Sequence, residues 1–180
     1  MDDSVVELGA GTGLTSVVAG MVAGQVLSTD ISSCNILKLI EANCQENSKW
    51  IRGKVSVCEL DFYKDTFSED LTVIIEKSKL IIAADVVYHD DLTDAFLKTL
   101  KKIMLMGVEK TALIALEKRF VFTISDLDVV APCYDYFFEN LQRVLSAFDI
   151  EQLNTSLVPQ YFCYERVKEL VLFKIQKKGR

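Results

Sequence analysis

Short apolar runs alternate with longer amphipathic stretches from one end of the chain to the other. Wholly apolar runs such as Leu80–Ala84 suit strands that are buried on both faces of a parallel sheet. In the longer stretches apolar side chains recur every three or four residues, which is typical of helices that bury one face. The pattern predicts strands over 4–8, 26–29, 54–60, 80–84, 111–116, 150–158 and 169–175, and helices over 13–23, 33–47, 90–103 and 134–148. Between these elements, 61–69 is expected to be a loop with at most a short helix, and 71–76 has no clear assignment.

The order of these elements predicts an α/β fold. Alternating strands and helices give an open, mostly parallel sheet with helices on both faces. The last two predicted strands have no helix between them, so we expect an antiparallel hairpin at one edge of the sheet. Nothing divides the 180 residues into parts, and this length suits a single domain spanning 1–180. Ligands of such sheets bind beyond the carboxyl ends of the strands, so the residues that follow each strand are the candidates for function.

Composition and charge narrow the class of partner. The net charge of −6 disfavours direct nucleic-acid binding and is compatible with a basic protein partner. Apolar runs stay below the ~18 residues of a membrane span, and Met1-Asp2-Asp3 is unlike a signal peptide, so we expect a soluble intracellular chain without membrane contact. Five cysteines without a Cys-x-x-Cys pair, and the single His89, give no metal-ligand pattern, so no metal is expected.

The segment Glu7-Leu8-Gly9-Ala10-Gly11-Thr12-Gly13 follows the first predicted strand and opens the first predicted helix. Alternate glycines let the backbone turn tightly and approach a ligand, and the N–H groups at the start of the helix point towards it. A dinucleotide fingerprint would place its third glycine at position 14, where Leu14 stands. The spacing acidic-x-Gly-x-Gly-x-Gly is instead the pattern of class I methyltransferases, which bind S-adenosylmethionine. A glycine turn without any cofactor is the alternative.

Acidic residues follow the second and third predicted strands. Asp30 lies about 20 residues after the glycine turn, where a carboxylate can accept hydrogen bonds from both hydroxyls of a ribose. Its alternative role is to cap the helix that follows. Asp61 can accept from an adenine amino group, with Leu60 and Ile31 as apolar walls, or it is a solvated loop residue.

The fourth predicted strand ends in Ala84-Asp85, and Tyr88 follows three residues later. A charge at the end of an apolar strand is costly without a partner, so Asp85 is expected to meet a ligand or the backbone N–H groups of the next turn. Tyr88 can face the same cleft. His89 is either a surface residue or a proton relay, and Asp90 or Asp91 is predicted to cap the following helix.

Together these motifs resemble the seven-beta-strand protein-lysine methyltransferases. The resemblance covers nearly the whole chain, and its most specific mark is the Asp-x-x-Tyr element Asp85-Val86-Val87-Tyr88. It implies a Rossmann-like class I methyltransferase fold and methyl transfer from S-adenosylmethionine to lysine side chains of a protein. It also implies the nucleus as location, with the cytoplasm as a further possibility. The other matching motifs are the glycine turn, Thr29-Asp30, Leu60-Asp61-Phe62 and Leu116-Glu117-Lys118-Arg119.

The resemblance also assigns roles to residues by their place in these motifs. Asp85 and Tyr88 are the catalytic candidates, at the place where the target lysine approaches. Phe62 stands where a tryptophan is common, and Glu117-Lys118-Arg119 is expected to form structural pairs without a catalytic role. The cofactor-binding candidates are Gly9, Gly11 and Gly13 for the methionyl end, Asp30 for the ribose and Asp61 for the adenine, together with Glu7, Ile31, Leu60 and Ala84.

Family members carry a segment before the glycine motif that closes over the cofactor. The first predicted strand here begins almost at Met1, so the resemblance implies a chain that lacks this segment. One alternative function is therefore a non-catalytic binding or scaffold domain with a degenerate cofactor site. The other is a methyltransferase that acts on a small molecule.

Overall fold

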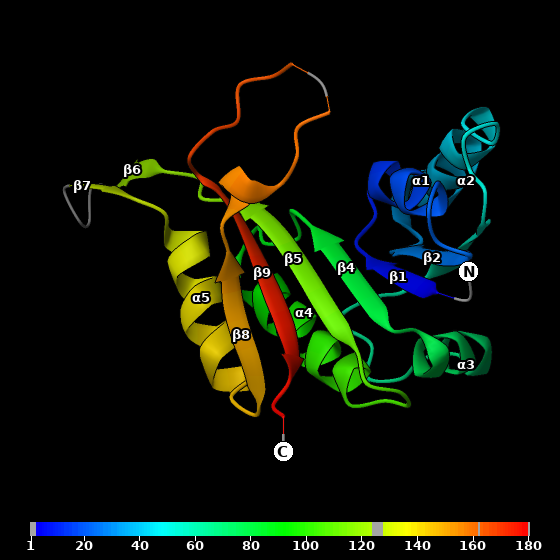
Figure 1. Ribbon diagram of the computed structural model, residues 1–180. Helices are drawn as coiled ribbons and strands as arrows, with labels where there is room; N and C mark the ends of the chain where they lie inside the picture. The colour runs from blue at the N-terminus through cyan, green and yellow to red at the C-terminus, as the bar shows by residue number, and fades with distance from the viewer. Residues whose placement is uncertain (1–2, 124–127, 162, 180) are drawn as a thin grey trace.

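The chain forms a seven-stranded sheet in the order β3-β2-β1-β4-β5-β9-β8 (Figure 1). The computed structural model describes residues 3–123, 128–161 and 163–179. Strand β9 runs antiparallel to the strands on either side of it, β5 and β8. The strands of this sheet are β1 (Ser4–Leu8), β2 (Gln25–Asp30), β3 (Lys54–Glu59), β4 (Leu80–Ala84), β5 (Thr111–Glu117), β8 (Phe148–Leu153) and β9 (Leu170–Lys177).

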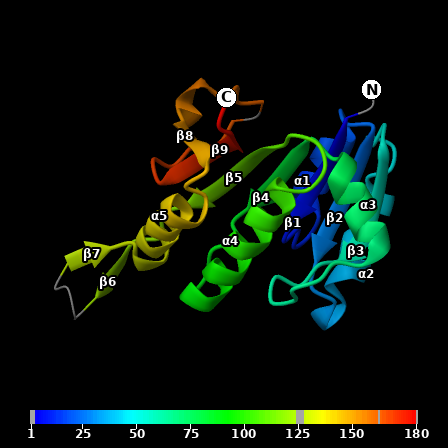
Figure 2. The same cartoon turned by 90° about the horizontal axis from the view of Figure 1, so that it is seen from below.

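Helices pack on both faces of the sheet (Figures 1 and 2). The larger apolar core lies between the sheet and α3, α4 and α5, and its fully buried members include Phe96 of α4 and Phe173 of β9. A smaller cluster, with Val5 and Val26 on the opposite side of β1 and β2, packs against Ala19 of α1. The helices are α1 (Leu14–Gly20), α2 (Ile36–Glu46), α3 (Glu69–Lys77), α4 (Asp90–Met104) and α5 (Pro132–Val144), with short 3-10 turns at Ser33–Asn35 and Thr155–Leu157.

The predicted α/β fold, its mostly parallel sheet and its antiparallel C-terminal strands are confirmed. Helix ends differ from the expected ones by up to four residues, and the unassigned segment 71–76 lies within α3, which begins after the cap Ser68. The cap of α4 is His89 and not Asp90 or Asp91, since the His89 Nδ1 accepts from the Leu92 N–H at 3.3 Å. Two short antiparallel strands, β6 (Val121–Thr123) and β7 (Asp128–Val130), were not predicted. They follow β5 along the chain and project away from the seven-stranded sheet (Figure 1).

The direction in which strands are added to the sheet reverses at β1. The chain runs outward from β1 through β2 to β3, then returns to place β4 on the other side of β1. Loops that leave β1 and β4 therefore diverge, and the carboxyl ends of these two neighbouring strands border an open crevice. None of the helices in the described part of the chain is long and apolar enough to cross a membrane.

Candidate functional site

The turn after β1 places glycines in the left-handed region of backbone space. Gly9 and Gly11 have φ angles of 68° and 57°, and Gly13, with φ 79°, directly precedes α1. A Cβ on Gly9 would lie 2.7 Å from Cγ1 of the buried Val86, so a larger residue does not fit there. A Cβ on Gly11 would have no other atom within 4 Å, so this stretch of backbone faces open space.

Asp30 ties the end of β2 to the glycine turn. Its Oδ2 accepts from the Gly11 N–H at 2.7 Å, and its Oδ1 accepts from the Ile31 N–H at 2.7 Å. The Ala10 N–H also donates to the Thr29 carbonyl at 2.9 Å. A carboxylate has about four acceptor positions, so each Asp30 oxygen retains one for a ligand hydroxyl.

Glu7 lies buried beneath the glycine turn and contacts α1 and β2. Its side chain is 1% exposed, and Oε2 accepts a hydrogen bond from the Ser16 hydroxyl in α1. The Thr29 hydroxyl donates to the Glu7 carbonyl at 2.6 Å. Burial raises the pKa of Glu7 above its ordinary value, and the hydrogen bond from Ser16 partly offsets this effect. Glu7 thereby joins β1, β2 and α1 at the point from which the glycine turn begins.

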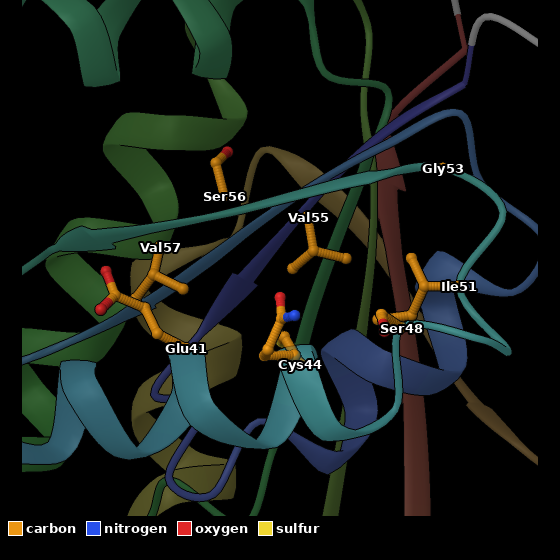
Figure 3. A pocket seen from close by; sticks show the side chains of 9 residues that line it. Glu41, Cys44, Ser48, Ile51, Gly53, Val55, Ser56 and Val57 are labelled. Carbon is orange, nitrogen blue, oxygen red and sulfur yellow. The ribbon is translucent and has the colours of Figure 1, made fainter.

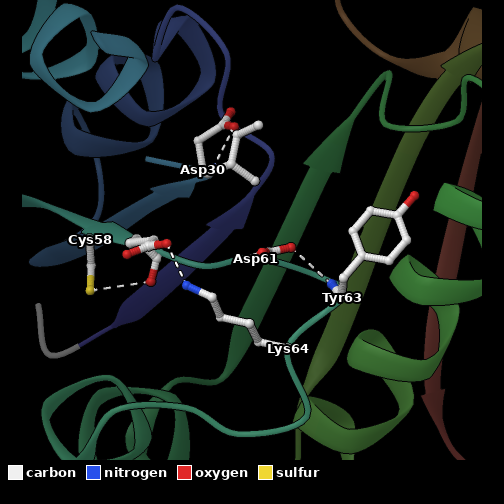
Figure 4. A network of polar contacts seen from close by, with 7 residues as sticks. Asp30, Cys58, Asp61, Tyr63 and Lys64 are labelled. Atoms are coloured by element: carbon white, nitrogen blue, oxygen red, sulfur yellow. Dashed lines mark hydrogen bonds and ion pairs between the residues drawn. The ribbon is translucent and has the colours of Figure 1, made fainter. Parts of the chain in front are cut away.

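The segment after β3 carries a buried, an acidic and an aromatic residue in sequence. Leu60 is buried, and its N–H donates to the Asp30 carbonyl at 2.8 Å. The Asp61 Oδ1 accepts from the Tyr63 N–H at 3.0 Å, as the dashed line in Figure 4 shows. Phe62 meets Phe96 of α4 edge to face, with 5.4 Å between ring centroids. Helix α4 thus holds Phe62 against the glycine turn, where its Cζ lies 3.8 Å from the place of a Cβ on Gly9.

Asp85 and Tyr88 lie beyond the end of β4. Asp85 adopts a left-handed conformation with φ 56°, and its N–H donates to the Ala115 carbonyl of β5 at 2.8 Å. Its carboxylate forms an ion pair with Arg119, whose guanidinium also lies 5.6 Å from the ring centroid of Tyr88. A non-glycine residue held with positive φ is strained, and such residues cluster at functional sites. The Cys133 thiol of α5 donates to the Tyr88 carbonyl at 3.3 Å, which fixes the backbone of this turn.

One cavity of about 360 Å³ connects the glycine turn with the residues after β4. This volume lies within the roughly 300–1,000 Å³ of ordinary small-molecule sites. Polar groups on its wall are the carboxylates of Asp30 and Asp85 and the side chains of Ser33 and Tyr88, and the rest of its lining is largely apolar. The lining residues are Gly9, Gly11, Asp30, Ile31, Ser33, Cys34, Ile36, Phe62, Asp85, Val86, Tyr88 and Leu92.

The structure brings six of the eleven candidate site residues into this cavity, namely Gly9, Gly11, Asp30, Ile31, Asp85 and Tyr88. The other five surround it. Glu7 and Leu60 are buried beneath the strand ends, Gly13 begins α1, Ala84 is exposed at the end of β4, and Asp61 borders a neighbouring hollow.

Sequence reasoning missed the contribution of the turn at Ser33–Asn35 and the identity of the partner of Arg119. Cys34 and Asn35 both have positive φ, and this turn places Ser33 and Cys34 on the cavity wall. Asparagine tolerates this conformation, which was the one signal available in the sequence. Arg119 was correctly expected to form a structural pair, but a partner 34 residues away leaves no local pattern.

A second hollow lies between α2 and β3 and is separate from the strand-end cavity (Figure 3). Cys44 and Glu41 of α2 and Val55 and Val57 of β3 line it. Burial raises the pKa of the Cys44 thiol, so the reactive thiolate is disfavoured. The Cys44 thiol of this hollow is therefore not an activated nucleophile.

Comparison with known proteins identifies a matching family and several relatives. Residues 1–144 match the lysine methyltransferase family. Methyltransferase-like protein 22 of Mus musculus is 35% identical over 96% of this chain and 49% of its own length. The protein N-lysine methyltransferase METTL21A of Danio rerio is 38% identical over 55% of this chain and 43% of its own length. The chain thus spans about half the length of the curated relatives it matches.

Solved structures of low sequence identity share the fold. The glycopeptide N-methyltransferase MtfA, complexed with sinefungin, superposes with a TM-score of 0.64 at 13% identity, over 99% of this chain and 82% of that one. The DhpI complex with SAH gives 0.61 at 14% identity, over 99% of this chain and 78% of that one. The seven-stranded methyltransferase fold expected from the sequence is therefore confirmed.

Proposed function

The chain belongs to the lysine methyltransferase family, and we propose that it transfers methyl groups from S-adenosylmethionine to lysine side chains of a protein substrate. The observation that carries this proposal is the single cavity that joins the glycine turn and Asp30 to Asp85 and Tyr88. Cofactor and acceptor can meet there without any rearrangement of the sheet.

The residues at the glycine turn fit the cofactor. The open space over Gly11 is a cradle that a single Cβ would partly fill, and the free acceptor positions of Asp30 suit two neighbouring hydroxyls. Ile31, Ile36 and Phe62 offer apolar walls for a flat base. S-adenosylmethionine, when bound, supplies a methyl group on a positively charged sulfur.

In this proposal Asp85 and Tyr88 bind the lysine that accepts the methyl group, and together they are called the acceptor side of the site. A lysine amine must be neutral to attack, and its ordinary pKa is about 10.4, so the site must favour loss of its proton. Contact of the amine with the apolar wall around the buried Val86 would lower its pKa by removing water, and the exposed Tyr88 ring borders the same place. The Asp85 carboxylate accepts a hydrogen bond from the incoming ammonium and orients its nitrogen towards the glycine turn. The ammonium passes one proton to water before attack, and the new N–C bond forms as the S–C bond of the methyl donor breaks. Holding the reacting atoms about 3–3.5 Å apart then provides most of the rate gain.

Two finer parts of the proposal concern substrate and location. The net charge of −6 supports a basic protein substrate, since opposite charges favour encounter. The nucleus is proposed as the location, with the cytoplasm as the alternative, because the motifs resemble a nuclear member of the family. A fluorescent fusion of the whole protein, viewed in living cells, tests the location directly.

The first test is calorimetric titration with S-adenosylhomocysteine. We expect Asp30→Ala to bind at least tenfold more weakly than the unchanged chain, because the ribose hydroxyls lose their acceptor. Asp65→Ala is the matched control, since it removes an equally negative side chain that is exposed and lies outside the cavity. Equal affinity in all three proteins would place the cofactor elsewhere.

The second test measures transfer itself. The chain is incubated with methyl-labelled S-adenosylmethionine and a nuclear protein extract, and methyl-lysine is measured after complete hydrolysis of the protein. Asp85→Asn should lose most of this product and keep its affinity for S-adenosylhomocysteine. Label in small molecules alone would favour the small-molecule alternative, and cofactor binding without any product would favour the scaffold alternative.

A further inference from the structure

Arg119 contacts the acceptor side of the candidate site from the link that follows β5. It lies in the three-residue link between β5 and β6, and its guanidinium contacts both Asp85 and Tyr88. Nη2 donates to Oδ2 of Asp85, and the guanidinium carbon lies 5.6 Å from the Tyr88 ring centroid. Both of these contacts are made to residues that line the cavity.

A carboxylate beside the face of an aromatic ring is a receptor for a cation. The carboxylate supplies charge-assisted hydrogen bonds, and the ring supplies cation–π attraction. The ammonium group of a lysine side chain requires the same two partners. Arg119 therefore occupies the place that the chemistry of Asp85 and Tyr88 offers to an incoming lysine.

The pair is also accessible enough to exchange. The Arg119 and Asp85 side chains are 50% and 45% exposed, and ion pairs of such exposure add little stability. The backbone of Asp85, in contrast, is fixed, since its N–H is bonded to the Ala115 carbonyl of β5 and its φ is 56°. The arginine can leave while the backbone that carries the carboxylate stays in position.

We propose that Arg119 is a positioning residue that fills the acceptor place until a lysine side chain displaces it. This inference rests on the proposed function, because it assumes that Asp85 and Tyr88 receive the lysine. When a lysine ammonium displaces Arg119, the Asp85 carboxylate still has a cationic partner. A neutral side chain of the same shape would displace Arg119 and leave the carboxylate without one. Arg119 thus contributes to selection of lysine over apolar residues.

The test is a binding experiment that does not need turnover. The probe is Nα-acetyl-lysine methylamide, and the uncharged control ligand is Nα-acetyl-norleucine methylamide. Each is titrated onto the full chain saturated with S-adenosylhomocysteine, and binding is followed by the NMR shifts of the Asp85 and Tyr88 backbone amides. We expect Arg119→Gln to bind the lysine probe more tightly by up to about fivefold, the limit set by the weakness of exposed ion pairs.

Two variants complete the design. Lys98→Gln removes the same charge from another exposed ion pair, with Asp65, and should bind the probe as the unchanged chain does. Asp85→Asn should no longer bind the lysine probe. A purely structural role for Arg119 would weaken binding on its removal, so a gain in affinity separates the two roles. The proposal would be overturned by unchanged or weaker binding of the lysine probe in Arg119→Gln, or by an equal gain in Lys98→Gln. It would also be overturned if the Asp85 and Tyr88 amides showed no shift in any protein. Saturation with S-adenosylhomocysteine is measured separately and reports on the cofactor site.

Discussion

Alanine at Gly9 should cost more stability than alanine at Gly11, whereas alanine at Gly11 should weaken cofactor binding. At Gly9 the left-handed φ of 68° costs an alanine about 1–2 kcal/mol. The added Cβ would also lie 2.7 Å from Val86 Cγ1, and overpacking of this kind costs about 1–3 kcal/mol. The two costs together give a loss of about 2–5 kcal/mol, or roughly 4–20 °C in melting temperature for a chain of this size.

Gly11→Ala is the matched variant, because it carries the conformational cost without the clash. Its φ is 57°, and its Cβ would meet no other atom within 4 Å, so the expected loss is only about 1–2 kcal/mol. That Cβ would project into the space assigned to the cofactor, so the affinity for S-adenosylhomocysteine should fall at least tenfold. Urea unfolding followed by circular dichroism measures the first effect, and calorimetry measures the second. Equal destabilisation by the two variants, or unchanged binding in Gly11→Ala, would refute this account of the turn.

Three further predictions address the core, the buried acid and the surface. Phe96→Ala should lose about 3–5 kcal/mol of unfolding free energy in urea, because Phe96 is fully buried against Phe62. Burial raises the pKa of Glu7, so the folded chain keeps this proton to a higher pH than the unfolded chain does, and stability falls as pH rises from about 4.5 through the raised value. Glu7→Gln should lack that fall when unfolding free energy is measured across this range, and a slope identical to that of the unchanged chain would contradict the assignment. Lys98→Ala should leave the melting temperature unchanged at any salt concentration, since both side chains of its ion pair are about three-quarters exposed.

Local patterns were sufficient to predict the central strands and the glycine turn. The apolar run of β4 and the alternate glycines after β1 each depend on neighbouring residues, so periodicity and spacing reveal them. Placement of Asp30 beside that turn followed from the general rule that ligands bind at the ends of parallel strands. These features are local or general to the fold class, and neither requires knowledge of side-chain packing.

Features that depend on distant contacts could not be predicted in this way. The partner of Asp85 comes from the link after β5, and the role of Glu7 as a buried support depends on a hydroxyl in α1. The cap of α4 was assigned to the wrong residue because aspartate is the more common cap, whereas the His89 ring nitrogen accepts the bond here. The β6–β7 pair has only three residues in each strand, which is too short for alternation to be recognised.

Because strand order reverses at β1, the residues of the site come from two separate parts of the chain. The glycine turn and Asp30 come from the part that ends with β3, and Asp85, Tyr88 and Arg119 come from the part that begins with β4. Under the proposed function, substitutions that change the acceptor side chain can therefore accumulate in one part without weakening binding of the methyl donor in the other. A chimaera that joins the first part of this chain to the second part of a relative should keep the donor and adopt the acceptor preference of that relative.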